Sequence, residues 1–336
     1  MRNHHIAPIA VVAGLVLLGW TVTALAQEVP PYPGERVKGK EAFIKVAAAQ
    51  FEPHIGDKAR NLAKMLELVD RAADQGVKLV VLPELANSGY IFNSKEEALA
   101  LSEPVPGGET TNKLIAKAKE QNIYIVFGID ERGDGYRLYN SAALVGPEGY
   151  IGKYRKLHLW DEEKIFFEPG DLGLPVFDLP FGRLGMMICY DGWFVETSRI
   201  LRLQGADIIA NPTNWIYVPG VITPEKPLAP NLHDSLAHAN KVFIVSADRI
   251  GTERNQPFLG LSNIAGPRGG LARASFDREE IITAEINLID ARYTIFTRLA
   301  DGLRDRRVDV YAPLLGYQAM PDPGAMPGAG AYLVPK

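Results

Sequence analysis

The sequence predicts an α/β protein built on mixed β-sheets. Apolar runs of strand length alternate along the chain with segments whose apolar residues recur every three or four positions, as on one face of a helix. Some strand-like runs also follow each other across short Gly-containing turns, at 132–135 and 146–149, which adds adjacent strands to the helix-connected ones. No break in composition divides residues 41–317, so we expect them to form one domain.

The first 26 residues have the organisation of a secretory signal peptide. Residues 6–18 are mostly apolar, and the small residues Ala24 and Ala26 stand at the −3 and −1 positions before Gln27. We therefore expect cleavage between Ala26 and Gln27, with export to the periplasm or secretion. The alternative is an uncleaved anchor, because about 20 apolar residues can span a bilayer.

Two further segments flank the expected domain. Residues 27–40 are rich in Pro and Gly and are predicted to be a linker, and residues 318–336 a Pro/Gly-rich C-terminal arm.

Cleavage leaves 336 − 26 = 310 residues, and loss of Arg2 changes the formal charge from −4 to −5. This mildly acidic balance does not favour nucleic acid as a partner. No second long apolar segment follows, so no membrane association is expected after cleavage.

The first half of the domain begins with a strand–helix–strand unit. Residues 44–50 form a short apolar strand, and Asp57 begins a helix that Gly76 ends. Apolar residues occupy one face of this helix: Leu62, Met65, Leu66, Val69, Ala72 and Ala73. The run at 77–82 is almost entirely apolar, as in strands buried on both faces. A second helix is expected at 110–118, and strands at 123–129, 139–145 and 150–154.

The second half continues the alternation. A buried strand at 185–188 precedes a helix at 195–203, and a strand at 207–210 precedes a helix at 232–240. The last expected strands lie at 242–246, 259–265 and 281–286.

Cys189 is the only cysteine in the chain, and it follows directly on the strand at 185–188. A thiol between a strand and a helix start lies near unpaired backbone N–H groups, and the helix dipole favours its thiolate. The alternative is an inert buried residue, as free cysteines often are. Exported proteins usually pair their cysteines in disulfides, so an unpaired one favours the reactive interpretation.

Two charged residues also stand where predicted strands end. Glu84 follows the apolar run at 77–82, and Lys156 follows the strand at 150–154. Ligands of α/β sheets bind beyond the carboxyl ends of the strands, so these side chains are candidates to meet Cys189. A carboxylate can take the thiol proton, and an ammonium can stabilise an oxyanion. The alternatives are an exposed turn residue for Glu84 and a solvated charge for Lys156.

Three sequence blocks together resemble the signature blocks of the nitrilase, or carbon–nitrogen hydrolase, superfamily. They are VVLPELANSGY (80–90), KYRKLHLWDEEKIFFEPGD (153–171) and GRLGMMICYDGWFVE (182–196), in that order. The resemblance extends from about residue 44 to residue 316 and includes NPTNW (211–215) and LRDRRVDVY (303–311). It implies a four-layer α-β-β-α sandwich with mixed sheets.

The resemblance also implies a role for each reactive residue. Cys189 is the expected nucleophile, Glu84 the general base and Lys156 the oxyanion stabiliser. The second glutamate of the family falls on Glu163 by its spacing, with Glu162 as the alternative if the loop is shifted by one residue. No cofactor and no metal are expected, and the implied partner is a second copy of the chain in a homodimer or larger homo-oligomer.

Aromatic residues near the three blocks are candidates for a substrate pocket. We expect Tyr90, Tyr190, Trp193 and Trp215 to bind substrate, with the backbone N–H of Tyr190 completing the oxyanion site. Trp160 is a further candidate for the pocket wall, and ordinary core packing is the alternative for each aromatic side chain. His158 could instead form a papain-like pair with the cysteine.

The motif Cys-Tyr-Asp-Gly (189–192) resembles amidase branches of the superfamily more than true nitrilases. The sequence therefore predicts a hydrolase that cleaves a small carboxamide to a carboxylate and ammonia through a cysteine thioester. The alternatives are a nitrilase and an N-carbamoyl-amide hydrolase. An acyltransferase and a non-catalytic binding protein are the remaining hypotheses.

Overall fold

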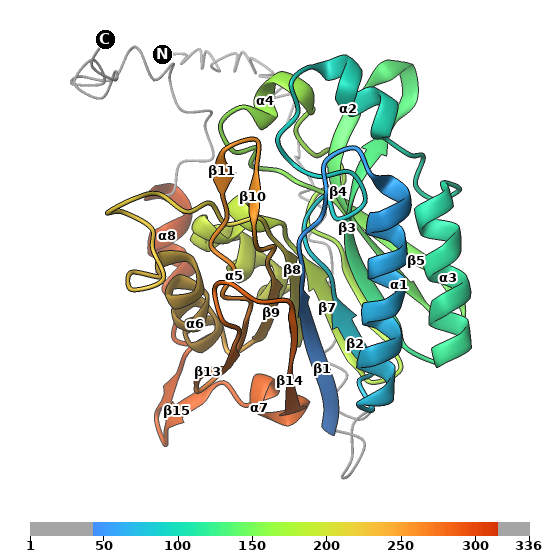
Figure 1. The fold of residues 1–336 in the computed structure, drawn as a ribbon. Coiled ribbons are helices and arrows are strands. Elements are labelled where there is room, and N and C mark those ends of the chain that lie inside the picture. The colour runs from blue at the N-terminus through green and yellow to red at the C-terminus, as the bar shows by residue number, and fades with distance from the viewer. Residues whose placement is uncertain (1–42, 315–336) are drawn as a thin grey trace, which may run out of the picture. The chain divides into compact units, whose positions relative to one another are not determined.

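The computed structural model describes residues 43–314, which contain two six-stranded sheets (Figure 1). The first sheet comprises β1 (Phe43–Gln50), β2 (Leu79–Val81), β3 (Tyr124–Arg132), β4 (Leu138–Gly146), β5 (Gly149–Arg155) and β14 (Glu280–Asn287). The second comprises β6 (Val176–Leu179), β7 (Gly182–Met186), β8 (Ile208–Pro212), β9 (Phe243–Ala247), β12 (Asn263–Gly266) and β13 (Gly269–Arg273).

Both sheets are mixed, as predicted. The first has the order β14-β1-β2-β3-β4-β5, in which β1, β2 and β3 are parallel and the outer pairs antiparallel. The second has the order β13-β12-β9-β8-β7-β6, with β7, β8 and β9 parallel. Each sheet therefore joins three parallel strands to antiparallel edges.

The main helices follow the strands in sequence. They are α1 (Lys58–Asp74), α2 (Lys95–Leu101), α3 (Glu109–Gln121), α4 (Glu163–Phe166), α5 (Val195–Leu203), α6 (Leu228–Asn240), α7 (Leu288–Arg292) and α8 (Val308–Leu314). Two 3-10 helices, η2 (Asp134–Tyr136) and η3 (Cys189–Trp193), and two hairpins complete the described part of the chain. The hairpins are β10 (Thr252–Glu253) with β11 (Gln256–Pro257), and β15 (Ile295–Thr297) with β16 (Ala300–Asp301).

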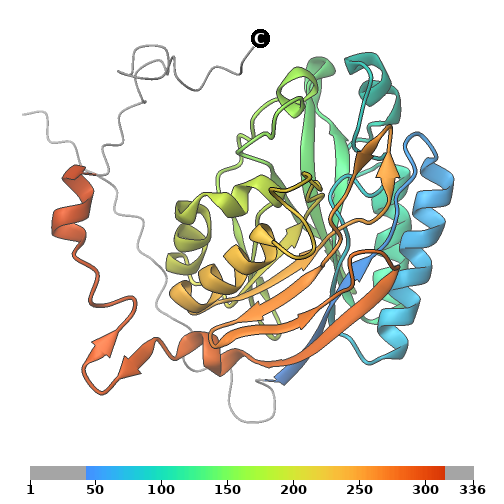
Figure 2. The same cartoon turned by 60° about the vertical axis from the view of Figure 1, so that its left-hand side comes forward.

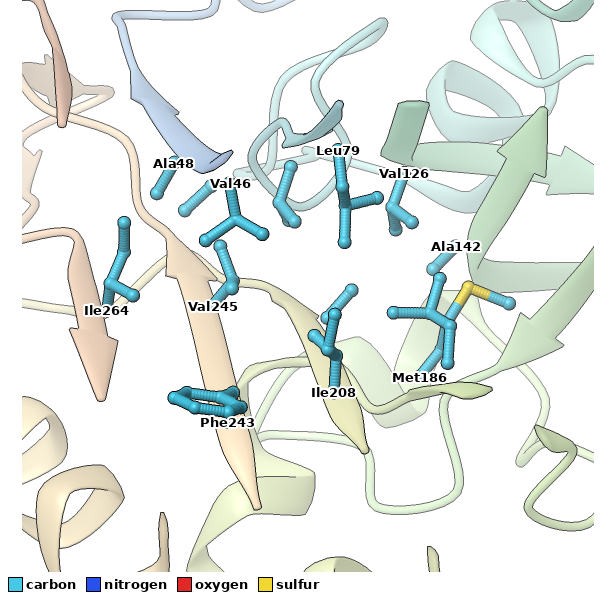
Figure 3. Close-up of a cluster of buried hydrophobic side chains, with 14 of the residues drawn as sticks. Val46, Ala48, Leu79, Val126, Ala142, Met186, Ile208, Phe243, Val245 and Ile264 are labelled. Atoms are coloured by element: carbon cyan, nitrogen blue, oxygen red, sulfur yellow. The ribbon is translucent and has the colours of Figure 1, made fainter. Parts of the chain in front are cut away.

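The two sheets pack face to face on a shared apolar core (Figure 3). Successive side chains of a strand point to opposite faces, so Val46 and Ala48 of β1 enter this core. Leu79 of β2 does the same from the first sheet, and Ile208 and Val245 meet them from the second. All five side chains are fully buried.

The opposite faces of the sheets are covered by helices. In the first sheet, Val80 packs in a separate cluster with Met65 of α1 and Leu114 of α3. In the second sheet, Ile209 shares a cluster with Leu201 of α5 and Leu236 and Ala237 of α6. Figure 1 shows α1 and α3 on one side of the paired sheets and α5 and α6 on the other. This arrangement confirms the expected four-layer α-β-β-α sandwich.

The boundaries of α1 agree with the sequence signals. The side chain of Asp57 accepts a hydrogen bond from the backbone N–H of Arg60 (3.1 Å), which caps the helix. Gly76 follows the helix end with a φ of +75°, a left-handed conformation that glycine adopts without steric cost.

The strand predicted at 259–265 is wrong in its first half. Gly260 and Leu261 have φ values of +64° and +62°, which interrupt an extended chain, and β12 begins only at Asn263. The helix predicted at 232–240 begins four residues earlier, at Leu228. The short elements α2, α4, β6, β13 and the two small hairpins were not predicted, because each is too short to show a hydrophobic period.

Several predictions fall on residues that the structure does not describe. The signal peptide (1–26), the linker (27–40) and the C-terminal arm (318–336) lie outside residues 43–314. Between residues 43 and 314, no helix has the length and apolar character needed to cross a bilayer. The homo-oligomer also stays a prediction. Figure 2 shows β15, β16 and α8 beyond the two sheet layers. Phe296 and Leu299 of this segment are exposed.

Strand β3 packs directly against the segment that follows β2. The backbone N–H of Gly128 donates to the carbonyl oxygen of Pro83 (3.0 Å), and that of Ala86 donates to the carbonyl of Gly128 (3.1 Å). A Cβ atom at position 128 would lie 2.4 Å from Cα of Glu84 and 2.5 Å from the backbone nitrogen of Leu85. The backbone at Glu84 therefore requires glycine at position 128.

We expect Gly128→Ala to lower the free energy of unfolding by about 2 kcal/mol or more, because backbone atoms cannot move aside as a flexible side chain can. Gly270→Ala is a matched control, since the atoms nearest to its added methyl belong to the side-chain carboxylate of Asp234, 3.0 Å away, and not to the backbone. Urea denaturation of both variants measures the difference. Equal losses would contradict the close approach described here.

Candidate active site

Three segments bring ionisable side chains together at one end of the paired sheets. Glu84 lies in the turn after β2, Lys156 directly follows β5, and Cys189 begins η3 after β7. Glu84 and Lys156 are almost completely buried, and Cys189 is 7% exposed. The strand-end positions predicted for these residues thus converge, as expected for an α/β sheet.

The ammonium of Lys156 lies between two carboxylates. Its Nζ atom donates to Oε1 of Glu84 (2.6 Å) and to Oε1 of Glu163 (2.7 Å). Asn140 Nδ2 also donates to Oε1 of Glu84 (2.7 Å), and the hydroxyl of Tyr90 donates to Oε1 of Glu163 (2.5 Å). Every member of this buried network therefore has a charged or hydrogen-bonding partner, which the burial of charge demands.

The structure distinguishes Glu163 from Glu162, which the sequence left as alternatives for the second glutamate of the family. Glu163 is buried and contacts Lys156, whereas Glu162 is exposed at the start of α4. The backbone N–H of Trp160 donates to the second oxygen of Glu163 (3.2 Å), which fixes the orientation of its carboxylate.

The electrostatics of the network set the protonation of its members. Burial, together with a smaller effect of Glu163, raises the pKa of Glu84 to about 7 against the opposing effect of Lys156. Burial alone would lower the pKa of Lys156, but the carboxylates of Glu163 and Glu84 outweigh it and raise this pKa above its usual value. Lys156 is therefore a permanent cation, while Glu84 can exchange a proton near neutral pH.

The two oxygens of the Glu84 carboxylate differ. Oε1 accepts from both Lys156 and Asn140, whereas Oε2 is buried and has no hydrogen-bond partner within residues 43–314. An unpaired buried oxygen on a group with a pKa near 7 is suited to accept a proton.

Cys189 has a left-handed backbone conformation, with a φ of +46°. This conformation is costly for a residue with a Cβ atom, and such outliers cluster at functional sites. Burial raises the pKa of the Cys189 thiol, as does Glu84, although Lys156 opposes them. The α-helix start expected beside the thiol lies further along the chain. Cys189 begins the short 3-10 helix η3, and α5 starts six residues later, at Val195.

His158 does not serve as the partner of the cysteine. Its Nδ1 atom lies 2.7 Å from Oδ1 of Asp191, and its ring stacks on Phe194 with a centroid distance of 3.7 Å. Asp191 also accepts from the hydroxyl of Tyr154 (2.7 Å) and the backbone N–H of Ile188 (2.9 Å). His158 and Asp191 thus hold together the segments that follow β5 and β7. This structural role of His158 excludes the papain-like alternative.

Cys189 opens into a small cavity of about 30 Å³ with mainly aromatic walls. The expected residues Tyr90, Tyr190, Trp193 and Trp215 all line it, as does Trp160. The sequence did not single out Asn214, Ile216, Ile222 and Ala229, which complete the lining.

Supporting residues were also missed. Asn140 lies near the start of β4, and Asn214 Nδ2 donates to the backbone carbonyl of Glu84 (3.0 Å). Glu253 accepts from the backbone N–H of Tyr90 (2.8 Å) and pairs with Arg249 (2.7 Å). These two contacts anchor the loop that carries Tyr90. Only Asn214 had a sequence signal, its place in NPTNW, because Asn140 and Glu253 contact Glu84 and Tyr90 from segments far apart in the chain.

Lys156→Met should destabilise the protein by about 3–5 kcal/mol, because Glu84 and Glu163 would then face each other without a cation. Lys117→Met is the matched control. Lys117 pairs with Asp70 (2.8 Å) at the surface, and such pairs contribute about 1 kcal/mol or less. Urea denaturation at pH 8 compares the two variants. A loss in Lys156→Met no larger than in Lys117→Met would show that the carboxylates do not need the ammonium.

Comparison with known proteins places this geometry in a family. The carbon–nitrogen hydrolase family profile matches residues 45–296. A nitrilase from Pyrococcus abyssi is 46% identical over 270 residues, which cover 80% of this chain and 99% of the relative. An N-carbamoylputrescine amidase from Solanum lycopersicum is 33% identical, with 82% and 96% covered.

A solved structure supports the same assignment. The carbon–nitrogen hydrolase from Helicobacter pylori G27 superimposes with a TM-score of 0.74 at 28% sequence identity, over 82% of this chain and 100% of that one. The chain therefore belongs to the carbon–nitrogen hydrolase family of the nitrilase superfamily, and it is a hydrolase of carbon–nitrogen bonds.

Proposed function

We propose that this hydrolase cleaves a small carboxamide to a carboxylate and ammonia through a thioester on Cys189. One observation carries the proposal: Cys189 lines an aromatic cavity and interacts electrostatically with the buried Glu84–Lys156 pair. A thiol nucleophile, a proton acceptor and a fixed cation that can stabilise an oxyanion are together suited to acyl transfer through a thioester.

In the first half-reaction, Sγ of Cys189 attacks the amide carbon while Oε2 of Glu84 takes the thiol proton. The carbonyl oxygen becomes an oxyanion, which the ammonium of Lys156 and the backbone N–H of Tyr190 stabilise. Glu84 then gives its proton to the amide nitrogen, the C–N bond breaks, and ammonia leaves a thioester behind. A raised pKa of the thiol is compatible with this order, because proton transfer accompanies the attack.

In the second half-reaction, Glu84 deprotonates a water molecule, whose oxygen attacks the thioester carbon. The same oxyanion donors stabilise the second tetrahedral intermediate. Its collapse breaks the C–S bond, releases the carboxylic acid and returns the proton to Cys189. Glu163 takes no proton in this sequence. Its role is to hold Lys156, to which it is hydrogen-bonded at 2.7 Å.

The cavity supports a small acyl group. Its volume is about 30 Å³, and its walls offer aromatic and aliphatic side chains with few polar groups. A short aliphatic chain would satisfy these walls, so a small carboxamide is the substrate that they favour.

A second candidate is the hydrolysis of an N-carbamoyl amine. A larger cavity, about 220 Å³, adjoins the first and shares Tyr90, Trp160 and Ile216 with it. The exposed carboxylates Asp161 and Glu162 line this second cavity and would attract the ammonium of a long diamine-derived substrate. The similarity to an N-carbamoylputrescine amidase supports the same candidate.

Ammonia release from a panel of small carboxamides, nitriles and N-carbamoyl amines tests the proposal. We expect the fastest turnover with a small carboxamide, and we expect Cys189→Ala to reduce it by about a thousandfold or more, because the nucleophile is lost. Turnover by Cys189→Ala at the wild-type rate would disprove the thioester. Turnover of nitriles alone would disprove the amidase assignment, and preference for an N-carbamoyl amine would favour the second candidate.

The pH dependence tests the assignment of Glu84 as the base. Only its ionised form can accept a proton, and its pKa is raised to about 7. We therefore expect kcat/KM for the preferred amide to fall with decreasing pH below about 7, by up to tenfold per pH unit. Initial rates between pH 5 and 9 provide the measurement. A kcat/KM that stays constant from pH 7 down to pH 5 would contradict this role.

A further inference from the structure

A buried histidine lies behind the nucleophile and has no part in the chemistry proposed above. His233 belongs to α6 and is fully buried. Its ring lies against η3, where a Cβ atom on Gly192 would be only 2.2 Å from His233 Nε2. The ring also makes an edge contact with Trp215, a wall of the cavity, at a centroid distance of 5.2 Å.

A chain of hydrogen bonds connects His233 to the backbone of Cys189. His233 Nδ1 lies 2.9 Å from the hydroxyl of Ser246, and Asn211 Nδ2 donates to the same hydroxyl (3.1 Å). Oδ1 of Asn211 then accepts the backbone N–H of Cys189 (2.9 Å). Asn211 and Ser246 face each other on the neighbouring parallel strands β8 and β9, and both are fully buried.

The donors and acceptors of this chain favour one arrangement of protons. The N–H of Cys189 can only donate, so Asn211 presents its oxygen to Cys189 and its NH₂ group to Ser246. The same NH₂ group lies 3.5 Å from Nδ1 of His233, where a second donor would be unfavourable, so Nδ1 is assigned as the acceptor of the Ser246 hydroxyl hydrogen. The ring proton is then on Nε2, which is buried and has no hydrogen-bond partner within residues 43–314. Burial lowers the pKa of His233 to about 3, which keeps the ring neutral.

We infer that His233, Ser246 and Asn211 are positioning residues that hold the Cys189 backbone in its reactive conformation. The importance of this conformation for catalysis rests on the amide hydrolysis proposed above. Cys189 has a φ of +46°, which a residue with a Cβ atom adopts only under constraint. The hydrogen bond from its N–H to Asn211 supplies a constraint at the strained residue itself.

The constraint matters because two reacting groups depend on it. The direction of Sγ follows from the Cys189 backbone, and the next peptide unit carries the N–H of Tyr190 that is assigned to the oxyanion. A small rotation at Cys189 therefore misplaces the nucleophile and the oxyanion donor together, while the cavity walls from other segments, such as Tyr90, Trp160 and Trp215, stay in place. Loss of the chain should lower kcat and leave KM nearly unchanged.

The test compares Ser246→Ala with Ser198→Ala. Ser198 is the matched control, because it is also a fully buried serine whose hydroxyl accepts from a buried asparagine, Asn240 Nδ2, at 2.9 Å. Ser246→Thr restores the hydroxyl, and His233→Phe keeps a ring but removes the acceptor. Each variant is studied as the full chain, with its melting temperature measured in the same buffer.

Two assays are performed on each variant. The first measures kcat and KM for the preferred amide. The second measures the rate at which iodoacetamide alkylates Cys189, a reaction in which Sγ displaces iodide to form a C–S bond. Mass spectrometry reports this reaction without ambiguity, because Cys189 is the only cysteine. Alkylation needs no turnover, so a failure of wild-type amide hydrolysis would disprove the proposed function and leave the positioning test intact.

We expect Ser246→Ala and His233→Phe to slow alkylation and to lower kcat by about tenfold or more, with KM changed less than about twofold. Ser246→Thr should recover most of both rates, and Ser198→Ala should match the wild type. Equal rates for Ser246→Ala and Ser198→Ala at similar melting temperatures would overturn the inference. If Ser246→Ala does not fold, wild-type rates in His233→Phe would overturn it instead.

Discussion

Removing an ionised side chain from water is costly, and this protein removes three of them together. Glu84, Lys156 and Glu163 are buried within hydrogen-bond distance of each other, so one ammonium must compensate two carboxylates. Asn140 and Tyr90 supply the additional hydrogen bonds that make this balance possible. The raised pKa of Glu84, the permanent charge of Lys156 and the raised pKa of the Cys189 thiol all follow from this arrangement.

The sandwich explains how residues from distant parts of the chain meet in so small a volume. The segments after β2 and β5 belong to the first sheet and the segment after β7 to the second, and the two sheets share one apolar core. Close backbone packing also fixes how nearly these segments approach their neighbours. Glycine at position 128 lets β3 approach the Glu84 turn, and glycine at position 192 lets η3 approach His233.

The sequence predicted the features that depend on local pattern. The buried strands, the start of α1 at the Asp57 cap and the strand-end positions of Glu84 and Lys156 were all readable from periodicity and turn residues. What depends on burial was not readable. The choice of Glu163 over Glu162 required knowing which carboxylate faces inward, and the pKa of Cys189 required knowing how completely the thiol is removed from water.

Long-range hydrogen bonds also could not be predicted from the sequence. Asn140, His233 and Ser246 have no local signature, because their partners lie 56, 13 and 35 residues away in the chain. His158 was weighed as a partner of the cysteine because histidine often has that role. Its contact with Asp191 depends on how β5 and β7 are brought together, which no spacing in the sequence reveals.

The free oxygen of Glu84 has a kinetic consequence. Since Lys156 and Asn140 occupy Oε1, a base acting through Oε2 has one position at which to hold either the departing ammonia or the incoming water. The two molecules then exclude each other, and water can enter only after ammonia has left. In the amide hydrolysis proposed above, this arrangement would give a ping-pong order, with the acyl-enzyme as an intermediate between two separate exchanges with the solvent.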